Sequence, residues 1–220
     1  MRVNLNIIYK IVVKDKGGKI VFEKEEESKS PLKNFLLLLN ALFRETYVGV
    51  VDTSGTTVNT SAKAYWSRWC SGGACWCNGG TGWCNAGNNP YWSDYAGLLA
   101  GAGEEDDTYG IIVGTNDTPV TPEDYNLGAK ISHGSEDGQL YYKGMVVGSS
   151  PRVEGDVVEQ VFSRVFRNDG SVDVSIKEIG FVVVTSSDNY KVLIIRDVLT
   201  NPVVVPGGGG VCIVTYKIQT

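Results

Sequence analysis

The sequence predicts a mainly β protein: an antiparallel β-sandwich or jelly roll with one helix in its N-terminal half and a long loop insertion rich in Trp, Cys and Gly. Three observations support this fold class. Apolar residues alternate with period two, turn-forming residues separate these segments, and 27 Gly with only 2 Met are typical of short strands and tight turns. At 220 residues the chain can form one sandwich domain, residues 1–220, with residues 64–108 as an exposed insertion.

Two hairpins are expected in the N-terminal half. Apolar side chains at alternate positions from Val3 to Val13 predict a strand, and residues 14–18, Lys-Asp-Lys-Gly-Gly, predict the turn after it. Residues 19–25 would form the returning strand. A second hairpin is predicted around residues 52–55, Asp-Thr-Ser-Gly.

The one substantial helix should lie between these hairpins. Ser30 can cap a helix and Pro31 suits its first position, and the Leu-rich segment that follows continues to Arg44. We expect its apolar side chains to pack against a sheet, with a membrane or partner contact as the alternative.

The C-terminal half is expected to be strand after strand. Thr121 and Asp124 suit the two ends of a single capped helical turn. Residues 168–170, Asn-Asp-Gly, form a strong hairpin signal. From residue 157 to 166 both alternating faces carry apolar side chains. The predicted strands cover residues 109–114, 157–166, 172–184, 191–198 and 211–218.

Charge and apolar runs limit the partners and the location. A net charge of −5 and a pI near 5.0 argue against nucleic acid as a partner, because no basic field exists to neutralise phosphates. The longest apolar run, residues 35–43, is too short to span a bilayer. The opening residues alternate and lack the apolar core of a signal peptide. We therefore expect a protein made in the cytoplasm that reaches a virion or another extracellular assembly without a signal peptide.

Four cysteines cluster inside the predicted insertion, and a fifth, Cys212, lies in the last strand. The spacing lacks a Cys-x-x-Cys unit, no histidine lies nearby, and iron–sulfur spacings do not fit. We favour two disulfides, because a loop so poor in aliphatic residues needs a covalent staple; a metal site and free thiols are the alternatives. Cys212 is expected to be a buried thiol. The disulfide candidates are Cys70, Cys75, Cys77 and Cys84.

All five tryptophans fall in the same insertion. Their amphipathic rings suit a subunit interface, packing of the loop on itself, or stacking against a sugar. The N-terminal strand could add to the sheet of a neighbouring subunit. The interface candidates are Trp66, Trp69, Trp76, Trp83 and Trp92 in the insertion, and Val3, Leu5, Ile7 and Tyr9 in the strand.

Residues 104–107, Glu-Glu-Asp-Asp, could hold calcium, but a solvated acidic loop is the commoner outcome. His133 is the only histidine, and it lies in a turn-like segment without a nucleophile signature. Nucleophile elbows, phosphate loops and metalloprotease motifs are missing from the sequence. We therefore expect no enzymatic activity, no cofactor and no catalytic metal.

The ordered motifs of the second half resemble structural proteins of tailed viruses, such as tail fibres. They comprise Tyr-Gly-Ile-Ile-Val-Gly-Thr at 109–115, Thr-Pro at 118–119, Asp-Tyr-Asn-Leu at 124–127, Phe-Ser-Arg-Val-Phe-Arg-Asn at 162–168, Ile-Lys-Glu-Ile-Gly-Phe at 176–181 and Leu-Ile-Ile-Arg-Asp-Val at 193–198. The resemblance covers about residues 109–220. It implies a β-sandwich that assembles with copies of itself or with other virion proteins.

The expected function is therefore that of a structural subunit of an extracellular assembly, with a virion or tail component as the leading hypothesis. A shell, tube or decoration role fits as well as a receptor-binding fibre. Two alternatives remain. One is a pilus-like surface filament that polymerises by strand exchange, and the other is a carbohydrate-binding module that uses the tryptophans of the insertion.

Overall fold

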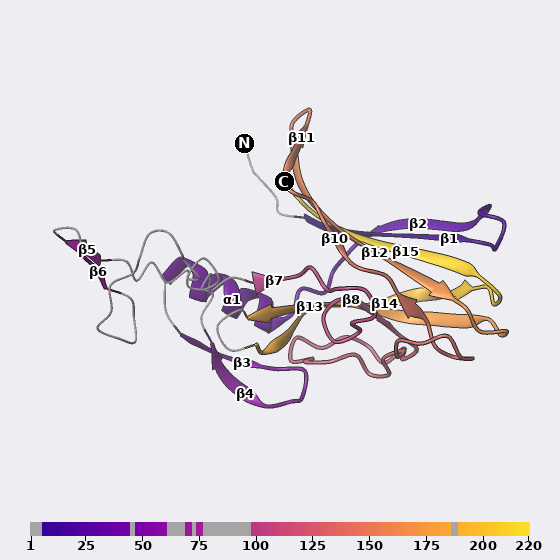
Figure 1. Cartoon of the computed structure of the whole chain (residues 1–220), viewed down its shortest axis with the longest axis horizontal. Coiled ribbons are helices and arrows are strands. Elements are labelled where there is room, and N and C mark those ends of the chain that lie inside the picture. Colours follow the sequence, from indigo (N-terminus) through magenta and orange to yellow (C-terminus); the bar gives the residue numbers. More distant parts are fainter. Residues whose placement is uncertain (1–5, 45–46, 61–68, 72–73, 77–97, 186–188) are drawn as a thin grey trace.

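The computed structural model describes residues 6–44, 47–60, 69–71, 74–76, 98–185 and 189–220. These residues form a mainly β protein with antiparallel sheets and one helix, as the sequence predicts. Two large sheets face each other, and the helix with a small hairpin lies at one end of the molecule (Figure 1).

The first large sheet, sheet A, contains the two ends of the described chain. Its order is β10-β12-β15-β1-β2, and β9 and β11 also pair with β12. All of its pairings are antiparallel. The strands are β1 (Asn6–Lys14), β2 (Ile20–Glu27), β9 (Tyr141–Tyr142), β10 (Val146–Val147), β11 (Arg152–Glu154), β12 (Val157–Asn168) and β15 (Gly210–Gln219).

The second large sheet, sheet B, is built around β13. Its order is β14-β13-β7, and β8 also pairs with β13. Gly180 lies where Leu127 and Leu193 approach β13, and a Cβ atom added there would come within 2.8 Å of the Leu127 side chain. The strands are β7 (Leu98–Leu99), β8 (Gly110–Gly114), β13 (Val174–Thr185) and β14 (Lys191–Val205).

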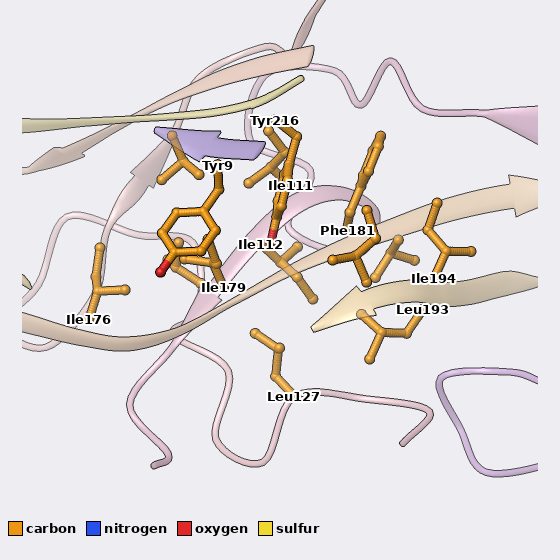
Figure 2. Close-up of a cluster of buried hydrophobic side chains, with 14 of the residues drawn as sticks. Tyr9, Ile111, Ile112, Leu127, Ile176, Ile179, Phe181, Leu193, Ile194 and Tyr216 are labelled. Carbon is orange, nitrogen blue, oxygen red and sulfur yellow. The ribbon is translucent and has the colours of Figure 1, made fainter. Parts of the chain in front are cut away.

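The core lies between the two sheets and continues on the far side of sheet B. Tyr216 of sheet A stacks on Phe181 of sheet B, with ring centroids 5.9 Å apart, and Tyr9 meets Tyr216 edge to face. Leu127 covers the other side of sheet B from these rings (Figure 2). Sheet B is therefore buried on both faces, which explains the unbroken run of buried residues at the end of β13.

The single helix, α1 (Lys33–Arg44), packs on the end of sheet B and on a two-stranded sheet. Leu38 and Ala41 face inward and are fully buried. Asn34 joins the helix to both sheets, because its side-chain amide donates to the carbonyl groups of Val51 and Leu193. The two-stranded sheet comprises β3 (Val48–Val51) and β4 (Thr57–Thr60), and a separate small sheet comprises β5 (Trp69–Ser71) and β6 (Ala74–Trp76).

Two local predictions are wrong, the start of the helix and the hairpin at residues 168–170. The helix begins at Lys33, because Pro31 forms a β-bridge to Ile195 and Ser30 accepts a hydrogen bond from Arg196 N; neither residue caps the helix. Residues 168–170 do not close a hairpin, since β12 belongs to sheet A and β13 to sheet B. A turn signal specifies a reversal of the chain, and it does not specify which sheet the next strand joins.

The last part of the predicted insertion, residues 98–108, is described. Most of these residues are exposed, as expected, but Leu98–Leu99 pairs with the end of β13 and Ala102 is buried. The chain thus returns to the sandwich by Leu98. Most of the predicted insertion, residues 64–97, lies outside the described residues, apart from β5 and β6.

Candidate assembly surfaces

The N-terminal strand is not the open edge that the sequence suggested. β1 lies between β15 and β2 and pairs with both along its length. Ile7 and Tyr9 are buried in the core, so these two interface candidates are wrong, because the apolar face of a strand inside a sandwich packs inward. Val3 and Leu5 lie outside the described residues.

The tryptophan and cysteine candidates are described only in part. The backbone of β5 pairs with that of β6, so that Trp69 is the cross-strand partner of Trp76, and Cys70 that of Cys75. Trp66, Trp83, Trp92, Cys77 and Cys84 lie outside the described residues. Cys212 is a buried free thiol, as predicted, and burial raises its pKa to about 12.

The acidic side chains of residues 104–107 form ion pairs and hydrogen bonds with separate groups of the same chain. Glu104 forms an ion pair with Lys143, and Glu105 accepts a hydrogen bond from Tyr141. Asp107 pairs with Lys130 and accepts the backbone N–H of His133. Among the residues whose side chains are described, no three acidic, His or Cys groups are arranged to hold a metal ion.

His133 contacts both tyrosines of β9. Its Nδ1 atom accepts a hydrogen bond from Tyr142 N at 3.2 Å, and its ring meets the Tyr141 ring edge to face. The ring thus lies between two tyrosines of β9, where it braces the turn before that strand.

Sheet A exposes two edges, and both carry features that discourage strand pairing. At one edge, β2 pairs only with β1 among the described strands, and residues 23–27 read Glu-Lys-Glu-Glu-Glu. At the other edge, β9, β10 and β11 are only two or three residues long, and residues 148–151, Gly-Ser-Ser-Pro, interrupt them. Charged and very short edge strands resist addition of a further strand.

The edges of sheet B are covered by the chain itself. Leu32 N donates to Ile194 O, and residues 30–32 thereby lie along the middle of β14. On the opposite side, Ile131 N donates to Val113 O, and Thr115 N donates to Ala129 O, which closes the outer side of β8. The geometry therefore gives little support to assembly through a long open edge.

The main exposed apolar surface of sheet A is instead a projecting arm. We use "valine arm" for β10, β11, the start of β12 and their connections, residues 146–160. The β11–β12 hairpin extends beyond the sandwich at the top of Figure 1. Val153 is 74% exposed and lies opposite Val158 across the hairpin. The exposed valines are Val146, Val147, Val153, Val157 and Val158.

A second apolar surface lies on the outside of α1. Leu36 is 64% exposed and Phe43 is 79% exposed, and their seven-residue spacing puts them on one face with the half-buried Leu39. We call Leu36, Leu39 and Phe43 the outer stripe. The prediction that the helix packs on a sheet is confirmed for its inner side only. The outer side of the helix is therefore also apolar, and among the described residues Leu36 and Phe43 stay exposed there.

A third feature is a buried cluster of charges on the outer face of sheet B. The Arg196 guanidinium donates from Nε to Glu178 at 2.8 Å and from Nη1 to Asp124 at 2.7 Å, and its Nη2 donates to Thr118 O. Glu178 is fully buried and also accepts the N–H groups of Gly128 and Ala129. Burial alone would lower the pKa of Arg196, but the two carboxylates raise it.

This cluster unites motifs that are far apart in the sequence. Arg196, Glu178, Asp124 and Thr118 come from four of the motifs that the sequence analysis singled out in the second half, and Gly114 from a fifth also lies here. A Cβ atom on Gly114 would come within 2.5 Å of the Glu178 carboxylate, so glycine is required there. The motif residues thus form a lock that fastens residues 115–131 over sheet B.

Sequence reasoning missed the valine arm and these charges as structural features. Adjacent Val157 and Val158 gave the only signal for the arm, because two neighbouring apolar residues in a strand point to opposite faces. The sequence gave no signal for the buried charges, since nothing in the sequence around an arginine distinguishes a buried side chain from an exposed one.

The fold and its surfaces define an antiparallel, sandwich-like β protein with two exposed apolar surfaces and a locked outer loop. No protein-family model, curated protein or solved structure matches the chain. Within the described part of the chain, no helix is both long enough and apolar enough to cross a bilayer.

Proposed function

We propose that this chain is a structural subunit that assembles with copies of itself, as a component of a virion or viral tail. The observation that carries the proposal is the valine arm, because five exposed valines, three of them on the projecting β11–β12 hairpin, lower the free energy of the chain only when a partner covers them. Such an arm lowers the solubility of a monomer, and in an assembly it provides a contact surface.

The buried lock supports the same proposal in a different way. The segments that resemble virion proteins converge on Arg196 and Glu178, where they stabilise the fold. A rigid sandwich with exposed projecting parts is what an assembling subunit needs. The pilus-like alternative by strand exchange receives less support, since the described sheet edges are charged, short or covered.

Carbohydrate binding is a second candidate, favoured by the concentration of all five tryptophans between positions 66 and 92. Titration with glycans tests it directly, because every tryptophan that fluoresces lies in that segment. Saturable quenching would support a binding module, and an unchanged spectrum across a glycan panel would argue against it.

The proposed function is tested by purifying the chain without denaturant and measuring its mass by light scattering over a range of concentrations, with electron microscopy of the same fractions. Rings, tubes or shells of many copies are the expected result. A monomer at every concentration would contradict self-assembly.

A further inference from the structure

We propose that Asp197 of β14 is a pH-sensitive latch for residues 28–32, which we call the strap: the strap lies on β14 while Asp197 is neutral and leaves it when Asp197 is ionised. The strap connects the end of β2 in sheet A to the start of α1, and on its way it covers the edge of β14 in sheet B. Its release exposes backbone groups of β14 to which another strand can pair. The inference concerns the fold of one copy and does not depend on the proposed self-assembly.

Few backbone hydrogen bonds hold the strap on β14. Leu32 N donates to Ile194 O at 2.9 Å, and Arg196 N donates to Ser30 O at 3.4 Å, which is long for a hydrogen bond. Pro31, between these two points, has no N–H group to donate. A segment held so lightly through its backbone depends on its other bonds to stay in place.

Those other bonds converge on the carboxyl group of Asp197. Ser28 donates to it from Oγ at 3.0 Å, and the Ser30 hydroxyl and the backbone N–H of Lys29 donate to it as well. From sheet A, the Tyr216 hydroxyl donates at 2.9 Å. All four donors are neutral groups, so they do not bring a positive charge against the carboxylate.

The strap is also a thin cover over this carboxyl group. Lys29 and Pro31 are exposed, whereas Asp197, which the strap contacts, is 5% exposed. Burial raises the pKa of Asp197, and it outweighs the bonds from Ser28 and Tyr216. Lifting the strap admits water, which stabilises the ionised form. The closed strap therefore favours the neutral carboxyl group, and ionisation favours opening.

The titratable groups that face Asp197 from sheet A do not replace it as the source of the effect. Tyr9 of β1 and Tyr216 of β15 keep their protons near neutral pH, because burial raises the pKa of both phenols. Glu26 of β2 accepts a hydrogen bond from Tyr9, and the bonds from Lys24 and Tyr9 lower its pKa. These groups keep their charge where Asp197 changes its own.

The two cationic residues next to these contacts point elsewhere. Arg196 precedes Asp197 on β14, but its guanidinium pairs with Glu178 and Asp124 on the outer face of sheet B. Lys29 is the one charged residue of the strap, and its side chain is exposed. The described ion pairs thus leave the charge of an ionised Asp197 without a cation.

Hydrogen exchange of the Leu32 and Arg196 amides tests the latch over about pH 4–8. Mass spectrometry with residue-level fragmentation reads single amides, and protection factors remove the pH dependence of intrinsic exchange. Protection of both amides should fall by up to about tenfold per pH unit above about pH 4 and level off above the raised pKa. In Asp197→Asn, which keeps an acceptor oxygen and cannot ionise, protection of both amides should stay constant.

The matched control is the other covered edge of sheet B, where the amides of Thr115 and Ile131 close the outer side of β8. Local opening there releases no buried Asp197, so their protection should stay constant with pH. A constant protection of the strap amides in the unmodified chain would overturn the inference, as would the same fall in Asp197→Asn or at Thr115 and Ile131. So would strap amides as protected as those of β13, because the strap would then open only with the whole sandwich. The comparison of the two edges needs no variant, and it decides the question even if Asp197→Asn fails to fold.

Discussion

Arg164 of β12 is the largest of the fully buried side chains, and its five hydrogen bonds go to main-chain carbonyl groups. It joins residues 103–111 and Lys143 to sheet A, and its guanidinium lies 4.8 Å from the centre of the Tyr142 ring. Carbonyl dipoles and an aromatic face replace the water that the charge has lost. The acceptors are the carbonyl oxygens of Gly103, Asp106, Tyr109, Ile111 and Lys143.

We expect Arg164→Met to lower the free energy of unfolding by about 3–5 kcal/mol, because removing the guanidinium leaves several buried carbonyl groups without donors. Urea denaturation followed by circular dichroism measures the change. Arg167→Met is the matched control on the same strand. Its partner Asp169 forms a partly exposed ion pair with it, so a loss of at most about 1 kcal/mol is expected. Equal losses in the two variants would refute a special role for Arg164.

At the scale of secondary-structure elements, α1 has two apolar sides with different surroundings. Leu38 touches the core and is 1% exposed, whereas Leu36 lies on the outer stripe only two residues away. In a monomer the two leucines should differ sharply in their contribution to stability, although their local helix propensities are the same.

We expect Leu38→Ala to destabilise the monomer by about 2–5 kcal/mol and Leu36→Ala by at most about 0.5 kcal/mol. Both variants should be measured by urea unfolding at a concentration where light scattering finds single copies, which removes assembly as a source of stability. A large loss for Leu36→Ala under these conditions would mean that the outer stripe is already covered within the subunit.

The elements that sequence predicts best here are the ones made from local contacts. The β1–β2 and β3–β4 hairpins follow from alternation and turn residues within a few positions, and both are confirmed. The boundary at Ser30 and Pro31 failed because a distant strand, β14, offers Ile194 and Ile195 as partners. Backbone pairing with a remote segment overrides a local capping signal, and no period in the sequence reveals it.

The placement of strands in the two sheets, and the buried charges, depend on partners far along the chain. Alternation predicted that one face of β1 is apolar, but Ile7 and Tyr9 could equally face a neighbour or the core. The register with β15 decides between these, and that register spans nearly the whole chain. The candidates in residues 64–97 stay predictions, apart from the backbone pairing of β5 with β6.

At the scale of the whole molecule, Asp197 connects the two sheets. It lies on β14 of sheet B and accepts hydrogen bonds from Tyr216 of β15 at 2.9 Å and from Ser28, just after β2, at 3.0 Å. Burial raises the pKa of this carboxyl, although the bonds from Ser28 and Tyr216 oppose the shift. The link between the sheets is therefore sensitive to protonation.

The raised pKa gives a signed prediction for stability against pH. A carboxyl whose pKa is higher in the folded state than in the unfolded state, where it is about 3.9, binds its proton more tightly when folded. The stability that it contributes is present below about pH 4 and is lost as the pH rises through the raised pKa. Asp197→Asn cannot ionise, so it should lose less stability than the unmodified chain between about pH 4 and pH 7.

Urea unfolding at several pH values measures this difference, again at a concentration where light scattering finds single copies. Two stability profiles that run parallel over the whole pH range would show that Asp197 does not ionise with a raised pKa. A profile for Asp197→Asn that falls more steeply than that of the parent would reverse the sign of the prediction.

The position of β1 between β2 and β15 also governs the order of events during synthesis. Tyr9 pairs with Tyr216, so β1 leaves the ribosome long before β15, the strand that satisfies its second edge. At ordinary elongation rates that interval is about 10–40 seconds. Throughout it the β1–β2 hairpin carries an unpaired edge and an apolar face, the two features that make a partly folded chain prone to aggregate.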